Sequence, residues 1–453
     1  MTSAKRIYFL GIGGIGMSAL ARYFMHKGLS VAGYDKTPTA LTRQLEAEGM
    51  VVVYNDALEA LPETMRTSEG TLVVITPAVP THHPQWQYFI REGFKIQKRA
   101  QVLGAISQQS RMLAVAGTHG KTTTSTLLAH LLHHAGRSIN AFLGGISVNY
   151  NTNLLIGDER VVVAEADEYD RSFLTLSPQQ AVITSVDADH LDVYGSHQSM
   201  LLAFADFASL VQPGGSLFYK KGIVLNSILA TDVKTYTYSI EEDADCVGRD
   251  VRISHGHYFA TFHTPWGILE NIRLGLPGRH NVENALAAAS MALCFGLSLD
   301  QVKAGLETFA GVRRRFERRV EGERLVYIDD YAHHPTELSA CIQSVRELYP
   351  GRRITGIFQP HLFSRTRDFA SGFMQSLDEL DECILLPIYP AREEPIAGID
   401  SAMLGAGMHH ARVRYAHLND AVAALPENLE GVLLTLGAGD IDTLVEPLTR
   451  RYQ

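Results

Sequence analysis

The stretch Ala114-Val-Ala-Gly-Thr-His-Gly-Lys-Thr-Thr-Thr124 decides the fold of the middle of this chain. An apolar strand is expected over 112–116, followed by a glycine-punctuated loop and a helix that begins at Lys121. Such a loop lets backbone N–H groups converge on an anion, while the helix N-terminus and Lys121 add positive charge. Thr122 would offer its hydroxyl to the Mg²⁺ of a nucleoside triphosphate. The stretch therefore predicts a phosphate-binding loop of the short form G-x-x-G-K-[ST], since Val115 replaces the first glycine of the longer pattern.

The helix after this loop is expected to have one apolar face and to end at Gly136. The residues on that face are Thr124, Leu127, Leu128, Leu131, Leu132 and Ala135. His130 and His134 fall on the opposite face, four residues apart. They could bind a metal, but a solvated helix face is the more ordinary interpretation.

Length and composition indicate a protein of several domains. A chain of 453 residues is too long for one core, so two or three domains are expected. The formal charge of -9 argues against a general nucleic-acid binder. The four cysteines are scattered, as expected of thiols in a reducing compartment. No apolar run reaches the ~18 residues of a membrane span, and the glycines after Leu10 argue against a signal peptide.

The first unit, residues 1–104, has the pattern of a dinucleotide fold. A buried strand over 6–10 leads into Gly11-Ile-Gly-Gly-Ile-Gly16, a G-x-G-x-x-G loop before a helix, and the next strand ends in Asp35. In such folds the acid holds a ribose hydroxyl. NAD is one candidate ligand, but any diphosphate-bearing nucleotide suits the same helix N-terminus.

A further strand of this unit, over 71–75, runs into a proline-stiffened loop that begins at Thr76. This loop lies at the carboxyl end of the predicted sheet, where ligands are expected. His82 and His83 follow in the loop, and exposure on the surface is a more ordinary role for them than ligand contact.

The second unit, residues 105–312, contains the phosphate loop and two acidic clusters. One predicted strand ends in Glu165-Ala-Asp-Glu168 and the next in Asp187-Ala-Asp-His190. Carboxylates at neighbouring strand ends beside a phosphate loop suit Mg²⁺, although histidine is an unusual ligand for it. The alternative is a solvated acidic loop.

The rest of this unit changes character. From 214 to 276 short strands and turns predict an antiparallel annex, and Pro277 then opens an alanine-rich helix. Asn281 and Asn284 at its start could read an adenine edge, but spacing alone favours helix capping for Asn281.

The third unit, residues 313–453, opens with a basic cluster, Arg313 to Arg315, in an acidic chain. Its pattern predicts a parallel α/β sheet, with a helix starting at Pro335. The expected strands are 325–328, 354–358, 383–388 and 432–436. Because His, Arg and Asp gather after these strands, we expect a site that handles a carboxylate or phosphate.

Three α/β units with these loops suggest an enzyme that breaks a phosphate bond of ATP to drive a reaction of a nucleotide-linked substrate. Hydride transfer would leave the phosphate loop without a role, and a simple kinase would leave the third unit without one. An ATP-dependent ligase uses all three.

Nine segments, in order, resemble the Mur ligase family over essentially the full chain. They are GIGGIGMSALA (11–21), GTHGKTTT (117–124), EADEYDRSF (165–173), DADHLDVYG (187–195), GRHNVENALAA (278–288), GVRRRFE (311–317), DDYAHHP (329–335), QPHLFSRTRDF (359–369) and LGAGDI (436–441). The resemblance implies an α/β protein of three domains. These are a Rossmann-like N-terminal domain, a central P-loop ATPase-like domain with an antiparallel annex, and a C-terminal Rossmann-like domain.

The resemblance also implies roles for individual residues. Those implied to bind ATP are Gly117, Thr118, His119, Gly120, Lys121, Thr122, Thr123, Asn281, Asn284, Arg315 and Asp330, which sets aside the capping interpretation of Asn281. Those implied to hold the UDP part are Gly11, Gly13, Gly14, Gly16, Asp35 and Thr76. Thr122 and Glu165 would bind one Mg²⁺ and His190 a second, and the catalytic residues would be Lys121, His190, His333, His361 and Arg365.

The implied reaction joins L-alanine to the carboxylate of UDP-N-acetylmuramate through an acyl phosphate, with ATP and Mg²⁺, in cytoplasmic peptidoglycan precursor synthesis. No nucleic-acid or membrane partner is expected, and the chain would be a monomer or weak homodimer. His333, His334 and His361 remain candidates for the base that takes the amine proton.

Three positions bear on how closely the chain follows the family. Leu362 stands where an arginine is common, and Tyr169 where a serine is frequent. Residues 196–210 lack the lysine that other members modify to bind metal, as expected for alanine addition. The alternatives are a recycling ligase that adds a whole peptide to the same nucleotide and, from another class, an NAD-dependent oxidoreductase.

Overall fold

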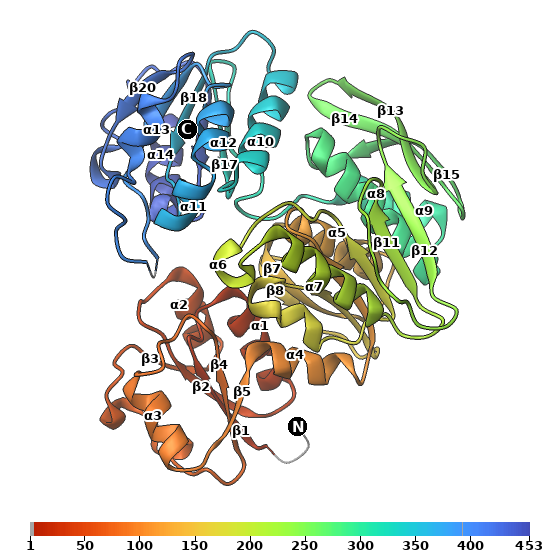
Figure 1. The fold of residues 1–453 in the computed structure, drawn as a ribbon, viewed down its shortest axis with the longest axis vertical. Coiled ribbons are helices and arrows are strands. Elements are labelled where there is room, and N and C mark those ends of the chain that lie inside the picture. Colours follow the sequence, from red (N-terminus) through yellow and green to blue (C-terminus); the bar gives the residue numbers. More distant parts are fainter. Residues whose placement is uncertain (1–3, 392) are drawn as a thin grey trace. The chain divides into compact units, whose positions relative to one another are not determined.

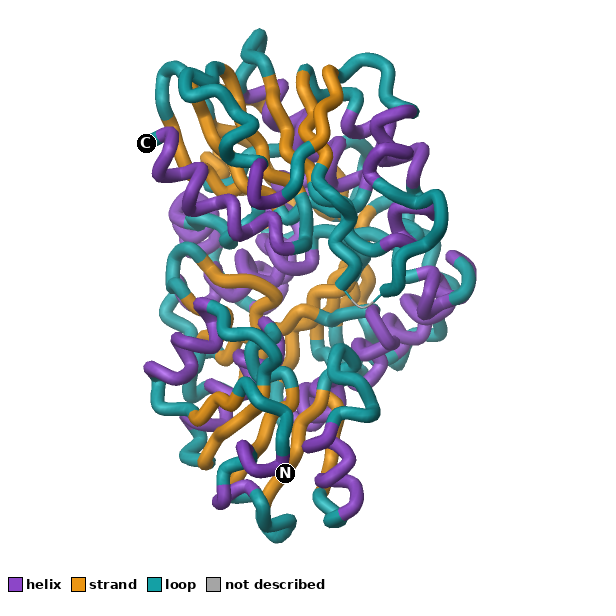
Figure 2. Tube along the Cα trace, turned by 90° about the vertical axis from the view of Figure 1, so that its left-hand side faces the viewer, coloured by secondary structure: helices purple, strands orange, loops and turns teal. Residues whose placement is uncertain are grey.

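The computed structural model describes residues 4–391 and 393–453, apart from the side chain of Asp192. Three sheets of five, ten and six strands follow one another along the chain (Figure 1). Figure 2 shows the strands between flanking helices. The α/β class and the three-domain organisation are therefore as expected from the sequence.

The first sheet is parallel throughout, in the order β3-β2-β1-β4-β5. Its strands are β1 Arg6–Leu10, β2 Ser30–Tyr34, β3 Val51–Val53, β4 Thr71–Ile75 and β5 Lys95–Lys98. Its helices are α1 Ile15–His26, α2 Ala40–Ala47 and α3 Pro84–Arg91. Crossover helices between parallel strands confirm the Rossmann-like prediction.

The central sheet has the order β15-β14-β13-β12-β11-β10-β6-β9-β7-β8. Its strands are β6 Arg111–Ala116, β7 Asn140–Ser147, β8 Thr152–Leu155, β9 Val161–Glu165, β10 Gln180–Ile183, β11 Ser216–Lys220, β12 Lys234–Ser239, β13 Cys246–Ser254, β14 His257–Thr264 and β15 Gly267–Leu274. Its helices are α4 Arg99–Ser107, α5 Lys121–His134, α6 Leu191–Tyr194, α7 His197–Ser209, α8 Arg279–Phe295 and α9 Leu299–Thr308. β6 pairs in parallel with β9 on one side and β10 on the other, so the loops after these three strands meet at one edge.

The antiparallel annex begins later than the sequence suggested. β11 and β12 pair in parallel and extend the central sheet. Only β13, β14 and β15, joined by two-residue turns, can run as antiparallel hairpins. The change of composition at 214 therefore lies within the parallel part of the sheet, which continues through β11 and β12 to the start of β13.

The third sheet has the order β16-β17-β21-β18-β19-β20 and is parallel except for β16. Its strands are β16 Glu317–Glu321, β17 Leu325–Asp330, β18 Ile354–Phe358, β19 Glu382–Leu385, β20 Arg412–Tyr415 and β21 Gly431–Leu436. Its helices are α10 Pro335–Leu348, α11 Phe363–Asp368, α12 Ala370–Leu377, α13 Ser401–Ala406 and α14 Val445–Tyr452. The four expected strands are present; β16 and β20 escaped notice because edge strands are rich in charge.

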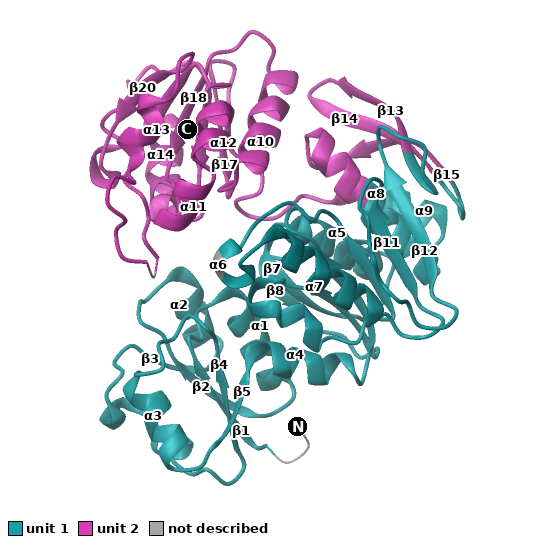
Figure 3. Cartoon of the chain, viewed as in Figure 1, with its two compact units in different colours: residues 1–247, 264–267, 286–305 teal, residues 248–263, 268–285, 306–453 magenta. Residues whose placement is uncertain are grey.

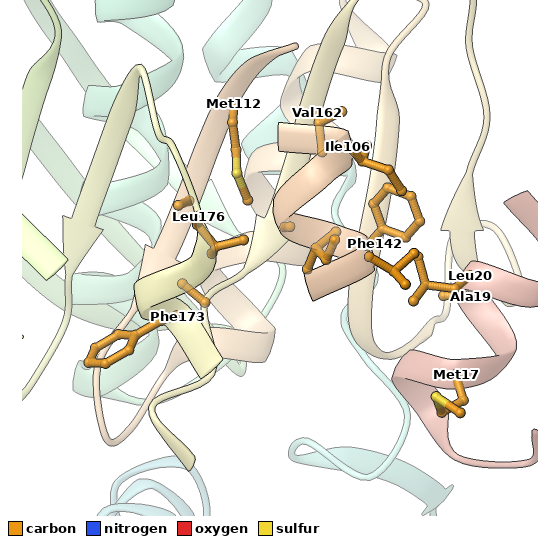
Figure 4. Packing of buried hydrophobic residues seen from close by; sticks show 14 of the residues in the cluster. Met17, Ala19, Leu20, Ile106, Met112, Phe142, Val162, Phe173 and Leu176 are labelled. Atoms are coloured by element: carbon orange, nitrogen blue, oxygen red, sulfur yellow. The ribbon is translucent and has the colours of Figure 1, made fainter. Parts of the chain in front are cut away.

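The chain divides into two compact units (Figure 3). Unit 1 comprises residues 1–247, 264–267 and 286–305, and unit 2 comprises 248–263, 268–285 and 306–453. Unit 1 holds the first sheet and most of the central one around one apolar cluster, in which Leu20 of α1 and Phe142 of β7 both lie (Figure 4). The two phosphate-binding patterns therefore belong to one packed body.

A polar network also joins α1 of the first sheet to β8 of the central sheet. The buried Arg22 guanidinium of α1 pairs with Glu48 at 2.8 Å and donates to Asn153 of β8. Asn153 Nδ2 in turn donates to Ser18 Oγ at 2.9 Å. The contacts of this buried guanidinium with Glu48 and Asn153 can form in only one orientation of the helix. They therefore fix the orientation of α1 on the central sheet.

Two histidine predictions are wrong. His130 is only 3% exposed, because α9 covers the second face of α5, and its Nδ1 lies 2.8 Å from Tyr150 Oη. His83 is also buried, with its ring edge-on to Tyr34. Both residues were expected at the surface because histidine is a polar residue type. Other parts of the folded chain pack over them and bury them.

No helix among the described residues is long and apolar enough to cross a bilayer.

Burial lowers the pKa of His130 to about 4, below its ordinary value of 6.5. Its neutral form is favoured in the fold, so the stability linked to it is complete above pH 6.5 and is lost as the pH falls towards 4. Between pH 7 and pH 5 the wild type should lose about 2 kcal/mol more unfolding free energy than His130→Gln.

Urea midpoints followed by circular dichroism at the two pH values measure this difference. The exposed His133→Gln serves as the control and should behave as the wild type does. Equal pH dependence in His130→Gln and wild type would contradict the assignment.

Candidate active site

Two glycines shape the loop between β6 and α5. Gly117 has φ +132° and Gly120, the N-cap of α5, has φ +79°, which are conformations that favour glycine. A Cβ at Gly117 would also overlap the Thr184 side chain at the end of β10. The loop is therefore held against the end of the neighbouring strand.

The segment after β10 fastens this loop. Thr118 N–H donates to the Ser185 carbonyl at 3.1 Å, and His119 N–H donates to Ser185 Oγ at 2.7 Å. Asp187 N–H donates to Thr118 Oγ1 at 3.0 Å. Two motifs about 65 residues apart thus form one assembly.

Lys121 lies within this assembly on a buried carboxylate. Its Nζ donates to the Gly117 carbonyl at 2.7 Å and to Glu168 Oε1 at 2.8 Å. Burial raises the pKa of Glu168 to about 7, although Lys121 opposes the shift. Burial would lower the pKa of Lys121, but the nearby carboxylates outweigh it and hold that pKa above its usual range. Lys121 therefore remains a cation at the start of α5.

A second carboxylate beside this loop comes from β9. Thr122 Oγ1 donates to Glu165 Oε2 at 2.8 Å, which brings together the two oxygens predicted to bind Mg²⁺. A Cβ at Gly144 of β7 would overlap the Glu165 carboxylate, so this strand glycine leaves the space that the carboxylate occupies.

His190 completes the group. It has φ +49° at the start of α6, and its Nε2 lies 3.7 Å from Glu168 Oε1. Tyr169, at the position that departs from the family, packs edge-on against the His190 ring at 5.2 Å between centroids.

The donor set can be tested against Mg²⁺. Among the described residues no three His, Cys, Asp or Glu side chains are placed to hold a metal by themselves. Thr122 and Glu165 nevertheless fit Mg²⁺, which takes one or two protein oxygens and completes its octahedron with phosphate and water.

The residues expected to hold the UDP part lie around the glycine loop of the first sheet, in unit 1. Gly13 N–H donates to Asp35 Oδ2 at 2.8 Å, so the acid expected on a ribose contacts the loop backbone in this structure. Gly11 lies against Thr76, and Gly14 is the N-cap of α1, which no side chain caps. The expected nucleotide residues, including Gly16 in the first turn of α1, therefore lie together.

Unit 2 contains the remaining expected residues. Asn281 and Asn284 are both buried in the first two turns of α8, where Asn284 Nδ2 donates to Asn281 Oδ1 at 3.1 Å. Asn281 Nδ2 donates to the Pro277 carbonyl at 2.6 Å. This amide donates to a carbonyl instead of accepting from a helix N–H, so the N-cap interpretation of Asn281 is wrong.

Asp330 and Arg315 lie at the carboxyl end of β17. The Asp330 carboxylate accepts from the backbone N–H of Phe316 and of Ala332, each at 2.7 Å. Burial raises the pKa of Asp330 to about 6, with Arg315 opposing the shift. The adjacent Arg314 differs, since it pairs with the buried Asp329 at 3.1 Å and has a structural role.

The predicted catalytic group of unit 2 surrounds the same sheet edge. The His333 and His361 rings lie 6.0 Å apart, and His361 stacks on Tyr389. Arg365 is buried on α11, which starts after Leu362 at φ +71°.

His334 is the N-cap of α10. Its Nδ1 accepts from Thr336 N–H at 3.3 Å, and His333 Nδ1 in turn lies 3.0 Å from the Tyr331 carbonyl oxygen. All three histidines remain candidates for the base.

Glu168 was expected only as a member of an acidic cluster suited to Mg²⁺, and its contact with Lys121 was not predicted. Ser185 and Gly144 were assigned no role from the sequence, although Gly144 carries the usual signal of a close approach, a glycine inside a strand. Nothing in the sequence singled out Ser185.

Comparisons with known proteins divide the chain into three parts, as its three sheets do. Three family models match the chain. Residues 6–111 match the model described as "Mur ligase family, catalytic domain", and residues 115–292 match "Mur ligase middle domain". Residues 314–439 match "Mur ligase, glutamate ligase domain". The chain is 50% identical over 452 residues to UDP-N-acetylmuramate--L-alanine ligase of Porphyromonas gingivalis, covering 99% of both chains. It is 46% identical over 450 residues to the protein of that name in Flavobacterium johnsoniae, covering 99% and 98%.

Solved structures agree. The crystal structure of UDP-N-acetylmuramate-alanine ligase from Thermotoga maritima matches with a TM-score of 0.84 and 28% identity, covering 99% of each chain. A murein peptide ligase from Psychrobacter arcticus has the same fold, with a TM-score of 0.72 and 21% identity over 99% of each chain.

Removing one partner of the buried Lys121–Glu168 pair should be costly, because the other charge stays buried without compensation. We expect Glu168→Gln to lower the unfolding free energy by about 3 kcal/mol. The double variant Lys121→Met with Glu168→Gln should be more stable than Glu168→Gln alone, since no buried charge is left.

Denaturant midpoints of the wild type, both single variants and the double variant give the coupling energy. A coupling near zero would show that the pair is solvated.

Proposed function

The chain belongs to the Mur ligase family, and from this premise we propose that it is an ATP-dependent ligase that joins L-alanine to UDP-N-acetylmuramate in peptidoglycan biosynthesis. The observation that carries the proposal is the 50% identity over 99% of both chains to a relative of that name. Alanine addition also suits residues 196–210, which contain no lysine.

The first step activates the muramyl carboxylate. A carboxylate is a poor electrophile, so its oxygen attacks the γ-phosphorus of ATP, forming an acyl phosphate and releasing ADP. Lys121 and the backbone N–H groups of the loop stabilise the charge on the transferring phosphoryl group. Thr122 and Glu165 would hold Mg²⁺, whose charge offsets that of the phosphates.

In the second step the free amine of alanine attacks the acyl carbon and phosphate leaves. The amine loses a proton, for which His333, His334 and His361 are the proposed acceptors. We assign Arg365 to the acyl phosphate, because guanidinium matches a phosphate in a bidentate way. His190, beside Glu168, is assigned to a second Mg²⁺.

The remaining assignments follow the family. ATP is assigned to Gly117–Thr123, Asn281, Asn284, Arg315 and Asp330, and the UDP moiety to Gly11, Gly13, Gly14, Gly16, Asp35 and Thr76. The proposed domains are 1–104 for the UDP-substrate, 105–312 for ATP and 313–453 for the amino acid. We place the protein in the cytoplasm, as a monomer or weak homodimer.

Phosphate release from ATP tests the function directly. It should require Mg²⁺, UDP-N-acetylmuramate and L-alanine together, because the acyl phosphate forms only on the muramyl carboxylate and is consumed only by an amine. Release with an L-Ala-D-Glu-diaminopimelate tripeptide and not with alanine would assign the chain to peptide recycling. Release with neither amine from folded protein would exclude a ligase of this kind.

A glycine variant tests the metal assignment. Gly144→Ala should push the Glu165 carboxylate from its place and raise the Mg²⁺ concentration for half-maximal activity about tenfold or more. Glu165→Gln should have the same effect, and the double variant should be no worse than either alone, because both changes act on one ligand.

The activity of the four proteins is titrated with Mg²⁺ at saturating substrates. Additive effects, or an unchanged Mg²⁺ requirement in Gly144→Ala, would remove Glu165 from the metal site.

A further inference from the structure

Arg99, the first residue of α4, lies between the glycine loop of the first sheet and the acidic loop after β9. Its Nη2 donates to Asp167 Oδ2 at 3.1 Å, in the acidic loop after β9. Its other edge faces the glycine loop, since a Cβ on Gly16 would lie 2.9 Å from Arg99 Nη1. One guanidinium thus spans from the acidic loop to the first turn of α1.

The third glycine of G-x-G-x-x-G usually permits close packing of helix on strand. Here the atoms nearest to the missing side chain of Gly16 are all from Arg99. The glycine therefore makes room for a cation. Arg99 Nη1 has no hydrogen-bond partner in the part of the chain that the structure describes, while the side chain is 23% exposed.

Asp167 lies between two carboxylates that contact the residues at the start of α5. It stands between Glu165, which contacts Thr122, and Glu168, which contacts Lys121. Its Oδ1 accepts from Tyr169 N–H at 3.1 Å and its Oδ2 from Arg99. A displacement of Asp167 therefore displaces both carboxylates that serve the phosphate loop.

The acidic loop is fastened to the start of α4 at further points. Lys98 Nζ pairs with Asp170 at 2.8 Å, and Thr175 Oγ1 donates to the Ala100 carbonyl at 2.8 Å. Asp170 and Arg171 have φ +52° and +54°, which is strain that persists only where the surroundings enforce it.

We propose that Arg99 is a substrate-positioning residue: its Nη1 edge binds the diphosphate of the nucleotide substrate at the glycine loop, while its Nη2 edge fixes Asp167. The inference rests on the proposed function, which puts a diphosphate on that loop. Binding of the nucleotide would then order the acidic loop beside Lys121, so the muramyl carboxylate meets a prepared phosphate site.

Steady-state kinetics separate this role from a merely structural one. Arg99→Ala should raise KM for UDP-N-acetylmuramate about ten- to a hundredfold, the range expected for a lost hydrogen bond between charged groups. KM for L-alanine should stay within about twofold. Arg99→Lys should recover only part of the loss, because an ammonium cannot serve two loops with a rigid fork.

Two further variants separate the roles of the Nη1 and Nη2 edges of Arg99. Asp167→Asn should lower kcat and leave KM for UDP-N-acetylmuramate within about twofold, because it weakens only the Nη2 edge. Lys98→Ala, which removes a neighbouring cation tied to the same loop, is the matched control and should keep KM for the nucleotide.

Thermal midpoints show which variants fold, and equilibrium binding of UDP-N-acetylmuramate without ATP confirms the KM assignment. An unchanged KM in Arg99→Ala, or an equal rise in Lys98→Ala, would overturn the inference. If Arg99→Ala does not fold, Arg99→Lys carries the test, and an unchanged KM there overturns it. If the wild type neither binds nor turns over UDP-N-acetylmuramate, the proposed function itself fails.

Discussion

The contact of Lys121 with the buried Glu168 is the interaction on which the active site depends. It holds a full positive charge at the start of α5, beside the carbonyl of Gly117. The pair is stable only because both partners are present, since either charge alone would be buried without compensation. The strand, the glycine loop, the helix and the acidic loop after β9 must therefore fold together.

Unit 1 supplies the rigidity that this arrangement needs. A shared apolar core and the Arg22–Glu48–Asn153 network fix α1 on the central sheet. Both predicted phosphate-binding loops consequently belong to one body. A ligase that builds an acyl phosphate benefits from such a body, because a misplacement of the reacting carboxylate by about 1 Å relative to the γ-phosphate can lower the rate about a hundredfold.

Burial shifts the pKa values of acids and of bases in opposite directions in both units. Glu168 and Asp330 have raised pKa values because low solvent access disfavours their charge, while His130 has a lowered one for the same reason. None of these shifts is visible in a sequence, because the largest cause of each is burial, which depends on how the folded chain packs around the group.

The sequence by itself determined the strands, the loops and most of the candidate site. Glycine loops between an apolar strand and a helix can be recognised locally, because both their conformation and their phosphate chemistry depend on adjacent residues. Nine ordered motifs were enough to indicate the family. All four predicted strands of the third sheet are present, and only its charged edge strands, β16 and β20, were not predicted, because alternation is weak there.

Tertiary structure alone decided which of these residues meet. The roles of Gly144, Ser185 and Glu168 arise from contacts between strands that are neighbours only in the sheet. The same is true of Arg99, whose two edges contact loops on either side of it in the sequence. His130 and His83 were misjudged because helix periodicity and loop composition describe one element at a time, whereas burial depends on what packs against it.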